Sequence, residues 1–162
     1  MKKLVIVLVA CMSYFVQAQV FPLLFQGTWM PNLLLAWMGA IAMVKGRRPA
    51  LFAAAGAGIV QDVLISNVFG LHLLPYIAGT FVLTMRSGTV YKEQWYMSAL
   101  AVLFLTLIDG AMQFGMILVG DLSIGFEYIV RTVLPTGLPN AALASCLHRV
   151  VWSMERREEY HW

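Results

Sequence analysis

Long apolar stretches separated by short polar segments run through almost the whole chain. An α-helix needs about 20 mainly apolar residues to cross the ~30 Å hydrocarbon core of a bilayer. The pattern predicts six membrane-spanning helices, over residues 4–25, 32–44, 49–66, 71–87, 96–119 and 128–152. The predicted fold class is therefore an all-α membrane protein, a compact bundle with residues 1–152 as its domain and 153–162 as a short cytoplasmic tail.

Some of these segments are irregular. The second is short, and it needs Trp29 and Met30, or local thinning of the bilayer, to cross. The third and fourth are joined only by residues 67–70, which predicts a tight helical hairpin. The sixth is interrupted by the run from Pro135 to Pro139, which predicts a kink.

Lys and Arg fall in clusters that define an orientation. They occur before the first segment, between the second and third, between the fourth and fifth, and at the end of the sixth: Lys2, Lys3, Lys45, Arg47, Arg48, Arg86, Lys92, Arg149, Arg156 and Arg157. The other three loops contain neither residue type. Because cytoplasmic loops are enriched in Lys and Arg, we expect six crossings with both termini in the cytoplasm, and only Arg131 on the outer side.

Composition agrees with a membrane protein. Hydrophobic residues make up 60% of the 162 residues and charged residues only 12%, against about a quarter charged in soluble domains. The net charge of +3 comes from clusters beside apolar runs, so it indicates orientation and not nucleic-acid binding. Cys11 and Cys146 lie in apolar segments, where a small hydrophobic role is favoured over a disulfide.

The first segment has a second interpretation. Residues 1–19 resemble a secretory signal, with Lys2 and Lys3 before an apolar core, and Leu8-Val9-Ala10-Cys11 resembles a lipoprotein signal. The apolar stretch continues to Phe25, so an uncleaved first helix is favoured. The tail likewise allows two interpretations, an extension of the sixth helix or a segment lying along the inner membrane surface.

Two carboxylates, Asp62 and Asp109, interrupt apolar segments. A charge at the bilayer centre costs roughly 2.5–3.5 kcal/mol on insertion scales, so it normally faces protein and has a partner. Helix rise places both about 20 Å from the cytoplasmic ends of their helices, at a depth similar to Arg131. We therefore expect an Asp62–Arg131 or Asp109–Arg131 ion pair.

Other polar residues recur at helical spacing and should face inward, because lipid offers no hydrogen-bond partners. These stripes are His72, Tyr76, Thr80 and Thr84; Thr106, Asp109 and Gln113; Thr132, Thr136 and Asn140; and Ser13 with Gln17. Hydrogen bonds that hold helices together, each worth about 0.6–2 kcal/mol, are favoured over a polar cavity open to the outer side. The small residues 53–58 predict close helix packing.

The predicted intramembrane polar cluster is Asp62, His72, Tyr76, Asp109, Gln113 and Arg131. No metal or cofactor site is predicted, because no second His or Cys lies at ligand spacing from His72. Phosphate-loop, HExxH and GxSxG motifs are absent from the sequence, and no Ser/His/Asp set suggests a triad. We therefore predict no catalytic residues.

Residues 48–80 combine a basic-Pro start, small residues and an Asp with a later Gly-Leu pair. Arg48-Pro49 leads through Gly56 and Gly58 to Gln61-Asp62-Val63-Leu64, and Gly70-Leu71-His72, Tyr76 and Gly79 follow. This pattern resembles the rod shape-determining protein MreD family. The motif positions are Pro49, Gly58, Asp62, Leu64, Gly70 and Leu71. The second half of the chain offers no residue-by-residue match.

The resemblance implies a six-helix fold similar to the substrate-binding subunits of energy-coupling-factor transporters, in the bacterial cytoplasmic membrane. It implies a non-enzymatic scaffold that controls cell shape and lateral peptidoglycan synthesis. The implied partners are an MreC-like bitopic protein, a RodA-like glycan polymerase, a penicillin-binding transpeptidase, an MreB-like filament on the cytoplasmic side, and membrane lipids.

Two other functions stay open. The alternative is a substrate-binding membrane subunit of a small-molecule transporter, which would hold its ligand with Asp62, His72, Tyr76, Asp109 and Arg131. An aromatic-walled outer cavity with unpaired polar groups would distinguish it from a scaffold. A minor possibility is an intramembrane acid–base enzyme that depends on Asp62 or Asp109.

Overall fold

The computed structural model describes residue 9 and residues 11–24, 30–64, 69–85, 93–119, 127 and 129–159, and every regular element in these ranges is a helix. The expected all-α class is confirmed. In chain order the elements are η1 (Val16–Val20), α2 (Phe21–Leu24), α3 (Leu33–Lys45), α4 (Arg47–Leu64), α5 (Leu73–Met85), α6 (Trp95–Val119), η2 (Ile129–Val133) and α7 (Leu134–Glu159). η1 and η2 are single π-helical turns.

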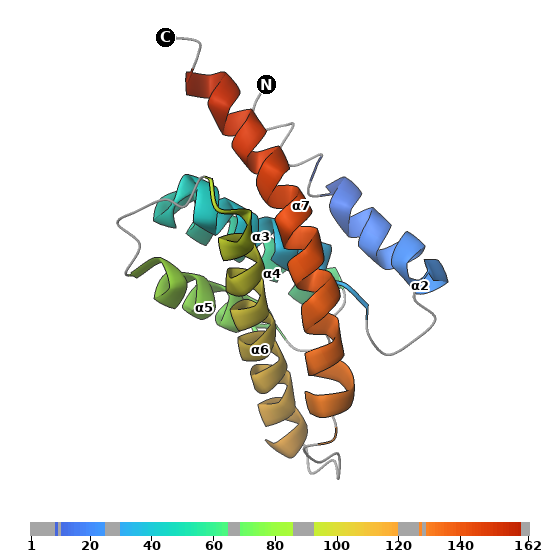
Figure 1. The fold of residues 1–162 in the computed structure, drawn as a ribbon. Coiled ribbons are helices and arrows are strands. Elements are labelled where there is room, and N and C mark those ends of the chain that lie inside the picture. Colours follow the sequence, from blue (N-terminus) through green and yellow to red (C-terminus); the bar gives the residue numbers. More distant parts are fainter. Residues whose placement is uncertain are drawn as a thin grey trace.

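Helix α3 occupies the centre of the molecule and contacts α4, α5, α6 and α7. Leu35 and Met38 of α3 are almost completely buried, and they share a hydrophobic core with Val102 and Leu105 of α6 and with Tyr76 of α5. The long helices α6 and α7 run side by side, while α4 and α5 form a neighbouring pair (Figure 1). The bundle therefore surrounds α3.

Both ends of α3 are well defined. Asn32 caps its start, because the side-chain oxygen of Asn32 accepts the backbone N–H of Leu35 at 3.0 Å. At its other end, a single residue forms the turn to α4. Gly46 ends the helix with φ +82°, a conformation that L side chains rarely adopt, and α4 begins at once with Arg47. Pro49 lies in the first turn of α4, where its missing N–H breaks no helical hydrogen bond.

Only one of the described helices, α6, is both long enough and apolar enough to cross a membrane by itself. Helices α3 and α5 have 13 residues each, which corresponds to about 20 Å and falls short of a ~30 Å hydrocarbon core. Helix α4 has 18 residues, but three of them, Arg47, Arg48 and Asp62, are charged. Of the six predicted spans, the fifth is thus the one that helix length and composition support.

The sixth predicted segment is helical on both sides of its prolines. Helix α7 includes Pro139, and the irregular π-helical turn η2 lies just before Pro135. Helix α7 also continues to Glu159, so residues 153–159 follow one of the two interpretations of the tail, an extension of the helix. Lys45 at the end of α3 pairs with Glu155 of this extension at 3.1 Å.

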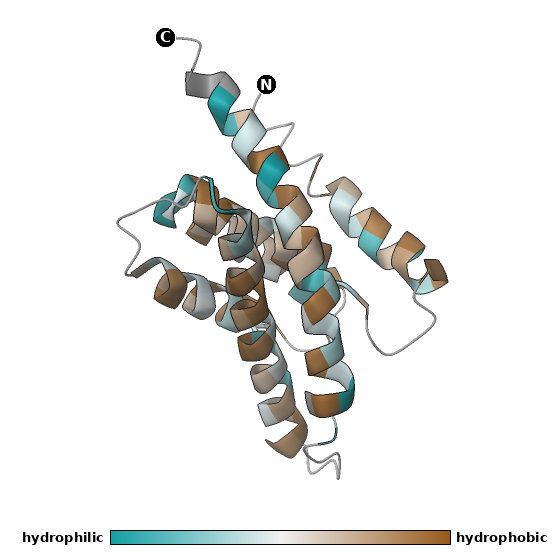
Figure 2. Ribbon diagram, viewed as in Figure 1, coloured by the Kyte–Doolittle hydropathy of each residue, from teal (hydrophilic) through white to brown (hydrophobic). Residues whose placement is uncertain are grey.

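Large apolar side chains are exposed on the surface, while several polar side chains are buried. Apolar side chains such as Phe52 (81% exposed) and Val119 (84%) lie on the surface, while Asp62 and Asn140 are buried. Hydrophilic residues gather at the start of α4 and toward the C-terminal end of α7 (Figure 2). Exposed apolar surface of this extent normally marks contact with a membrane or a partner.

Candidate functional site

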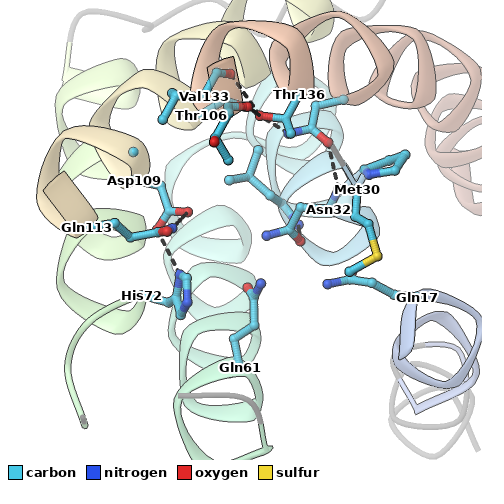
Figure 3. A pocket seen from close by; sticks show the side chains of 15 residues that line it. Gln17, Met30, Asn32, Gln61, His72, Thr106, Asp109, Gln113, Val133 and Thr136 are labelled. Atoms are coloured by element: carbon cyan, nitrogen blue, oxygen red, sulfur yellow. Dashed lines mark hydrogen bonds and ion pairs between the residues drawn. The ribbon is translucent and has the colours of Figure 1, made fainter. Parts of the chain in front are cut away.

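Several helix ends meet around a polar pocket of about 320 Å³ (Figure 3). The N-terminal ends of α3, α5 and α7 reach it, together with the C-terminal half of α4 and the middle of α6. Its lining combines amides, hydroxyls, an imidazole and a carboxylate with a few apolar groups: Gln17, Met30, Pro31, Asn32, Leu35, Gln61, His72, Thr106, Asp109, Gly110, Gln113, Thr132, Val133, Thr136 and Asn140. This volume lies at the lower end of the range for small-molecule sites.

Asp62 connects the end of α4 to the start of α5. Its carboxylate accepts hydrogen bonds from the backbone N–H groups of Gly70 (2.8 Å), His72 (2.8 Å) and Leu73 (3.1 Å). N–H groups at a helix start have no partner within the helix, so a carboxylate stabilises them. Gly70 has φ +100°, which lets the turn fold back toward the carboxylate. Asp62 therefore caps α5 from the neighbouring helix.

His72, Asp109 and Gln113 form a connected group on one side of the pocket. Nδ1 of His72 lies 2.9 Å from one carboxylate oxygen of Asp109, and Nε2 of Gln113 donates to the other at 3.0 Å. His72 and Asp109 are buried, at 8% and 7% exposure. The group joins α6 to the turn before α5, and it gives the Asp109 carboxylate a partner on each oxygen.

A chain of hydrogen bonds with one direction crosses from α3 to α4. Oδ1 of Asn32 accepts the Leu35 N–H, so its Nδ2 is the donor to the Tyr76 hydroxyl at 2.6 Å. The Tyr76 hydroxyl in turn donates its proton to Oε1 of Gln61. The Tyr76 hydroxyl accepts a hydrogen bond from Asn32, so its own O–H is available to donate to Gln61. The cap at the start of α3 thus orients the Gln61 amide through Tyr76.

Asn140 of α7 connects α3 to α6. Its Oδ1 accepts the backbone N–H of Asn32 at 2.6 Å, and its Nδ2 donates to the Thr106 hydroxyl at 3.0 Å. That hydroxyl donates to the backbone carbonyl of Val102 at 2.8 Å. The amide of Asn140, only 2% exposed, is therefore bonded on both sides and holds three helices in register.

The N-terminal helix, Cys11–Leu24, which includes η1 and α2, docks on α3 through hydrogen bonds of two polar side chains. Oε1 of Gln17, in η1, accepts the backbone N–H groups of Leu33 (2.8 Å) and Leu34 (3.3 Å). One turn earlier, the Ser13 hydroxyl accepts the indole N–H of Trp37 at 3.0 Å. Gln17 thus provides a cap for the start of α3 from another segment of the chain.

Replacing Gln17 with leucine should lower the free energy of unfolding by about 1–3 kcal/mol, because buried N–H groups at the start of α3 would lose their acceptor. The same change at exposed Gln19, in the same turn, provides the matched control. Unfolding by SDS in mixed detergent micelles measures both. Equal effects of the two substitutions would contradict the capping role.

Arg131 does not join the predicted cluster. Its guanidinium pairs with Glu127, one helical turn earlier, at 2.6 Å, and both side chains are largely exposed at 76% and 66%. The expected Asp62–Arg131 and Asp109–Arg131 pairs are therefore wrong. Backbone N–H groups satisfy Asp62, and His72 with Gln113 satisfies Asp109, so neither carboxylate needs a cation beside it.

The inward orientation predicted for the stripe on α5 is confirmed, since His72, Tyr76, Thr80 and Thr84 are all buried. The stripes on α6 and toward α7 likewise line the pocket. Helix-joining hydrogen bonds and a cavity, which the sequence presented as alternatives, are found together. The small residues 53–58 are divided, because Ala54, Ala57 and Gly58 are packed while Gly56 is exposed.

Sequence reasoning missed two polar connections. Asn32 was assigned only as the start of a span, although an Asn before an apolar run is a helix-capping signal. The hydroxyl of Ser98 lies 2.7 Å from Nδ1 of His148, and this fully buried pair joins α6 to α7. No periodic stripe connected these last two residues, because they lie on different helices.

Within the described ranges, no group of three His, Cys, Asp or Glu residues is placed so that it could hold a metal ion. The carboxylates and His72 are used instead in contacts between helices.

Compared with known proteins, the chain matches no protein family, no curated protein and no solved structure. The similarity of residues 48–80 to the MreD family therefore stays a prediction from the motif residues.

Proposed function

We propose that this chain is a multi-pass protein of the bacterial cytoplasmic membrane and a non-enzymatic scaffold of cell-wall elongation, as the MreD resemblance implies. Its partners would be an MreC-like bitopic protein, a RodA-like polymerase and a penicillin-binding transpeptidase. Through them it would control rod shape and lateral peptidoglycan synthesis.

The observation that carries this proposal is the way the motif residues fit together. Gly58 lies against Leu73, because a Cβ there would be 2.5 Å from the Leu73 Cα. Asp62 caps the same residue, and Gly70 shapes the turn between them. Gly58, Asp62 and Gly70 thus hold α4 and α5 together as a hairpin. The only reactive group among them, the Asp62 carboxylate, is buried and used in hydrogen bonds. Residues with this structural role suit a protein that presents a fixed surface to its partners.

Six crossings with both termini in the cytoplasm remain part of the proposal. The ion pair between Lys45 and Glu155 brings the cationic end of α3 to the far end of α7, which supports a common side for these ends. The short helices α3 and α5 would cross by tilting less and thinning the bilayer locally. Exposed apolar side chains around the bundle support contact with lipid.

Crosslinking in native membranes, followed by purification of the tagged chain and mass spectrometry, tests the scaffold proposal. We expect enrichment of an MreC-like protein and of wall synthases relative to an equally tagged, unrelated multi-pass protein. Enrichment of an ATPase module in place of these partners would overturn the scaffold and favour the transporter subunit.

The pocket is the observation that favours the second candidate, a substrate-binding transporter subunit. Among the described lining residues there is no Phe, Tyr or Trp, so the expected aromatic wall is not found there. The other expected mark is met in part, because several polar groups bond to one another while Nε2 of Gln61 and Nε2 of His72 have no partner in the described structure. The scaffold is preferred because of the fit of the motif residues, and the pocket needs an explanation of its own.

A further inference from the structure

We infer that the pocket binds an uncharged, oxygen-rich group, such as an amide-bearing sugar, through side-chain N–H donors of Gln61 and Gln17. This inference is independent of the scaffold role, because it rests on the hydrogen-bonding capacity of the pocket alone. The two donors come from different parts of the chain, α4 and the N-terminal helix.

Gln61 presents a fixed donor to the pocket. Its Oε1 is used by the Tyr76 hydroxyl, so its Nε2 is the free end of the amide. That nitrogen takes no partner in the described parts of the chain, although the residue is only 4% exposed. Figure 3 shows the amide facing the pocket. Because this N–H group faces the pocket without an acceptor, an incoming oxygen atom would give it a hydrogen-bond partner.

Gln17 presents a second donor from the opposite side. Its Oε1 must face the backbone N–H groups of Leu33 and Leu34, because only an oxygen can accept them. Its Nε2 therefore points away from α3, toward the space that Gln61 also faces (Figure 3). Gln17 is 8% exposed, so this donor too is largely shielded from bulk solvent.

His72 adds a third hydrogen-bonding group. Its Nδ1 is engaged with Asp109, and its Nε2 takes no partner from the rest of the described structure. An imidazole held at Nδ1 presents its other nitrogen in a defined direction. A ligand with both an acceptor oxygen and a polar hydrogen, as in a secondary amide, would match this set.

The charges around the pocket favour a neutral ligand. The described residues that line the pocket include no Lys or Arg, so among them an anion would meet the Asp109 carboxylate without a compensating cation. Arg131, the nearest candidate in sequence, is directed to Glu127 and is largely exposed. The Asp109 oxygens are already bound to His72 and Gln113, which leaves a cation without a dedicated partner. Burial of either charge would be costly.

Three sugars with the same ring test this preference: N-acetylglucosamine is neutral, glucosamine is a cation and glucuronic acid is an anion. The midpoint of thermal unfolding is measured for the full chain in lipid nanodiscs. We expect only N-acetylglucosamine to raise the midpoint, by about 5–10 °C at a concentration a hundredfold above its dissociation constant. An equal rise with a charged sugar would overturn the inference, and so would the absence of a rise with both the free and the alkyl form of N-acetylglucosamine.

Two variants assign the effect to the pocket. Gln61→Met removes the donor, with Gln94→Met as the control at an exposed glutamine. Thr132→Leu places a larger apolar side chain in the pocket. The Thr132 side chain makes no hydrogen bond in the described structure, so we expect this variant to fold even if Gln61→Met does not. We expect the rise to disappear in both and to persist in Gln94→Met. A rise that survives Thr132→Leu would overturn the assignment.

A free solute and a membrane-anchored headgroup can carry the same amide sugar. Repeating the titration with dodecyl N-acetylglucosaminide in the nanodisc separates these sources. A rise with the free sugar at matched total concentration indicates a solute, and a rise with the alkyl form alone indicates a headgroup. Both outcomes support the neutral class, while a rise with neither overturns it.

Discussion

Replacing Asp62 with leucine is expected to lower the free energy of unfolding by about 3–5 kcal/mol. The substitution leaves the backbone N–H groups of Gly70, His72 and Leu73 without their acceptor in a buried site. Unsatisfied buried donors are costly, because a leucine side chain provides no acceptor in their place. SDS titration of the purified protein in mixed micelles measures the loss.

Asp62→Asn and Glu127→Leu are the matched controls for this prediction. Asparagine keeps one acceptor oxygen, so it should cost clearly less than leucine. Glu127 is 66% exposed in its side chain, and its partner among the described residues is the exposed Arg131, so its loss should cost less than about 1 kcal/mol. If Asp62→Leu were as mild as Glu127→Leu, the carboxylate would not stabilise the α4–α5 hairpin.

Gly58→Ala is expected to lower the free energy of unfolding by about 1–3 kcal/mol. The new Cβ would lie 2.5 Å from the Cα of Leu73 and 3.1 Å from its backbone nitrogen. Because these are backbone atoms, a rotamer change cannot relieve the contact, and α4 must move away from α5. The movement would also lengthen the hydrogen bonds of Asp62, two residues from the end of α4.

Gly56→Ala, on the same helix, is expected to raise the free energy of unfolding. A Cβ at Gly56 has no neighbour within 4 Å, so alanine meets open space and gains helix propensity. We expect a stabilisation of about 0.5–1 kcal/mol. The same SDS titration compares the two variants. Loss of stability in both would show that the face of α4 that carries Gly56 is packed as well, and would contradict the open space at Gly56.

The helices were largely predictable from the sequence, whereas the partners of the charged residues were not. Apolar runs located α3, α4, α5, α6 and α7, since helix formation depends on local pattern. The beginning of α5 moved to Leu73 because the Asp62 carboxylate satisfies the preceding turn, and that contact depends on the fold of the hairpin. Similar depth alone suggested Arg131 as a partner, but depth does not fix the direction in which a side chain points.

The polar pocket was only half predictable. Helical spacing indicated that His72 and Asp109 would face inward, and the structure places them in contact. Spacing along single helices could not show that Asn32 would bond to both Asn140 and Tyr76, because those residues belong to other helices. Contacts of this kind follow from the packing of the whole bundle.

The one-residue turn at Gly46 also limits how the protein can move. Helices α3 and α4 have no connecting loop to absorb a change of angle, and the Asp62 cap with the Gly58 contact ties α5 to α4. These three helices therefore form a stiff frame, because hinges need residues that can change φ and ψ. Any opening of the pocket would come from the opposite wall, where the N-terminal helix is held by two side chains and η2 departs from regular α-helix.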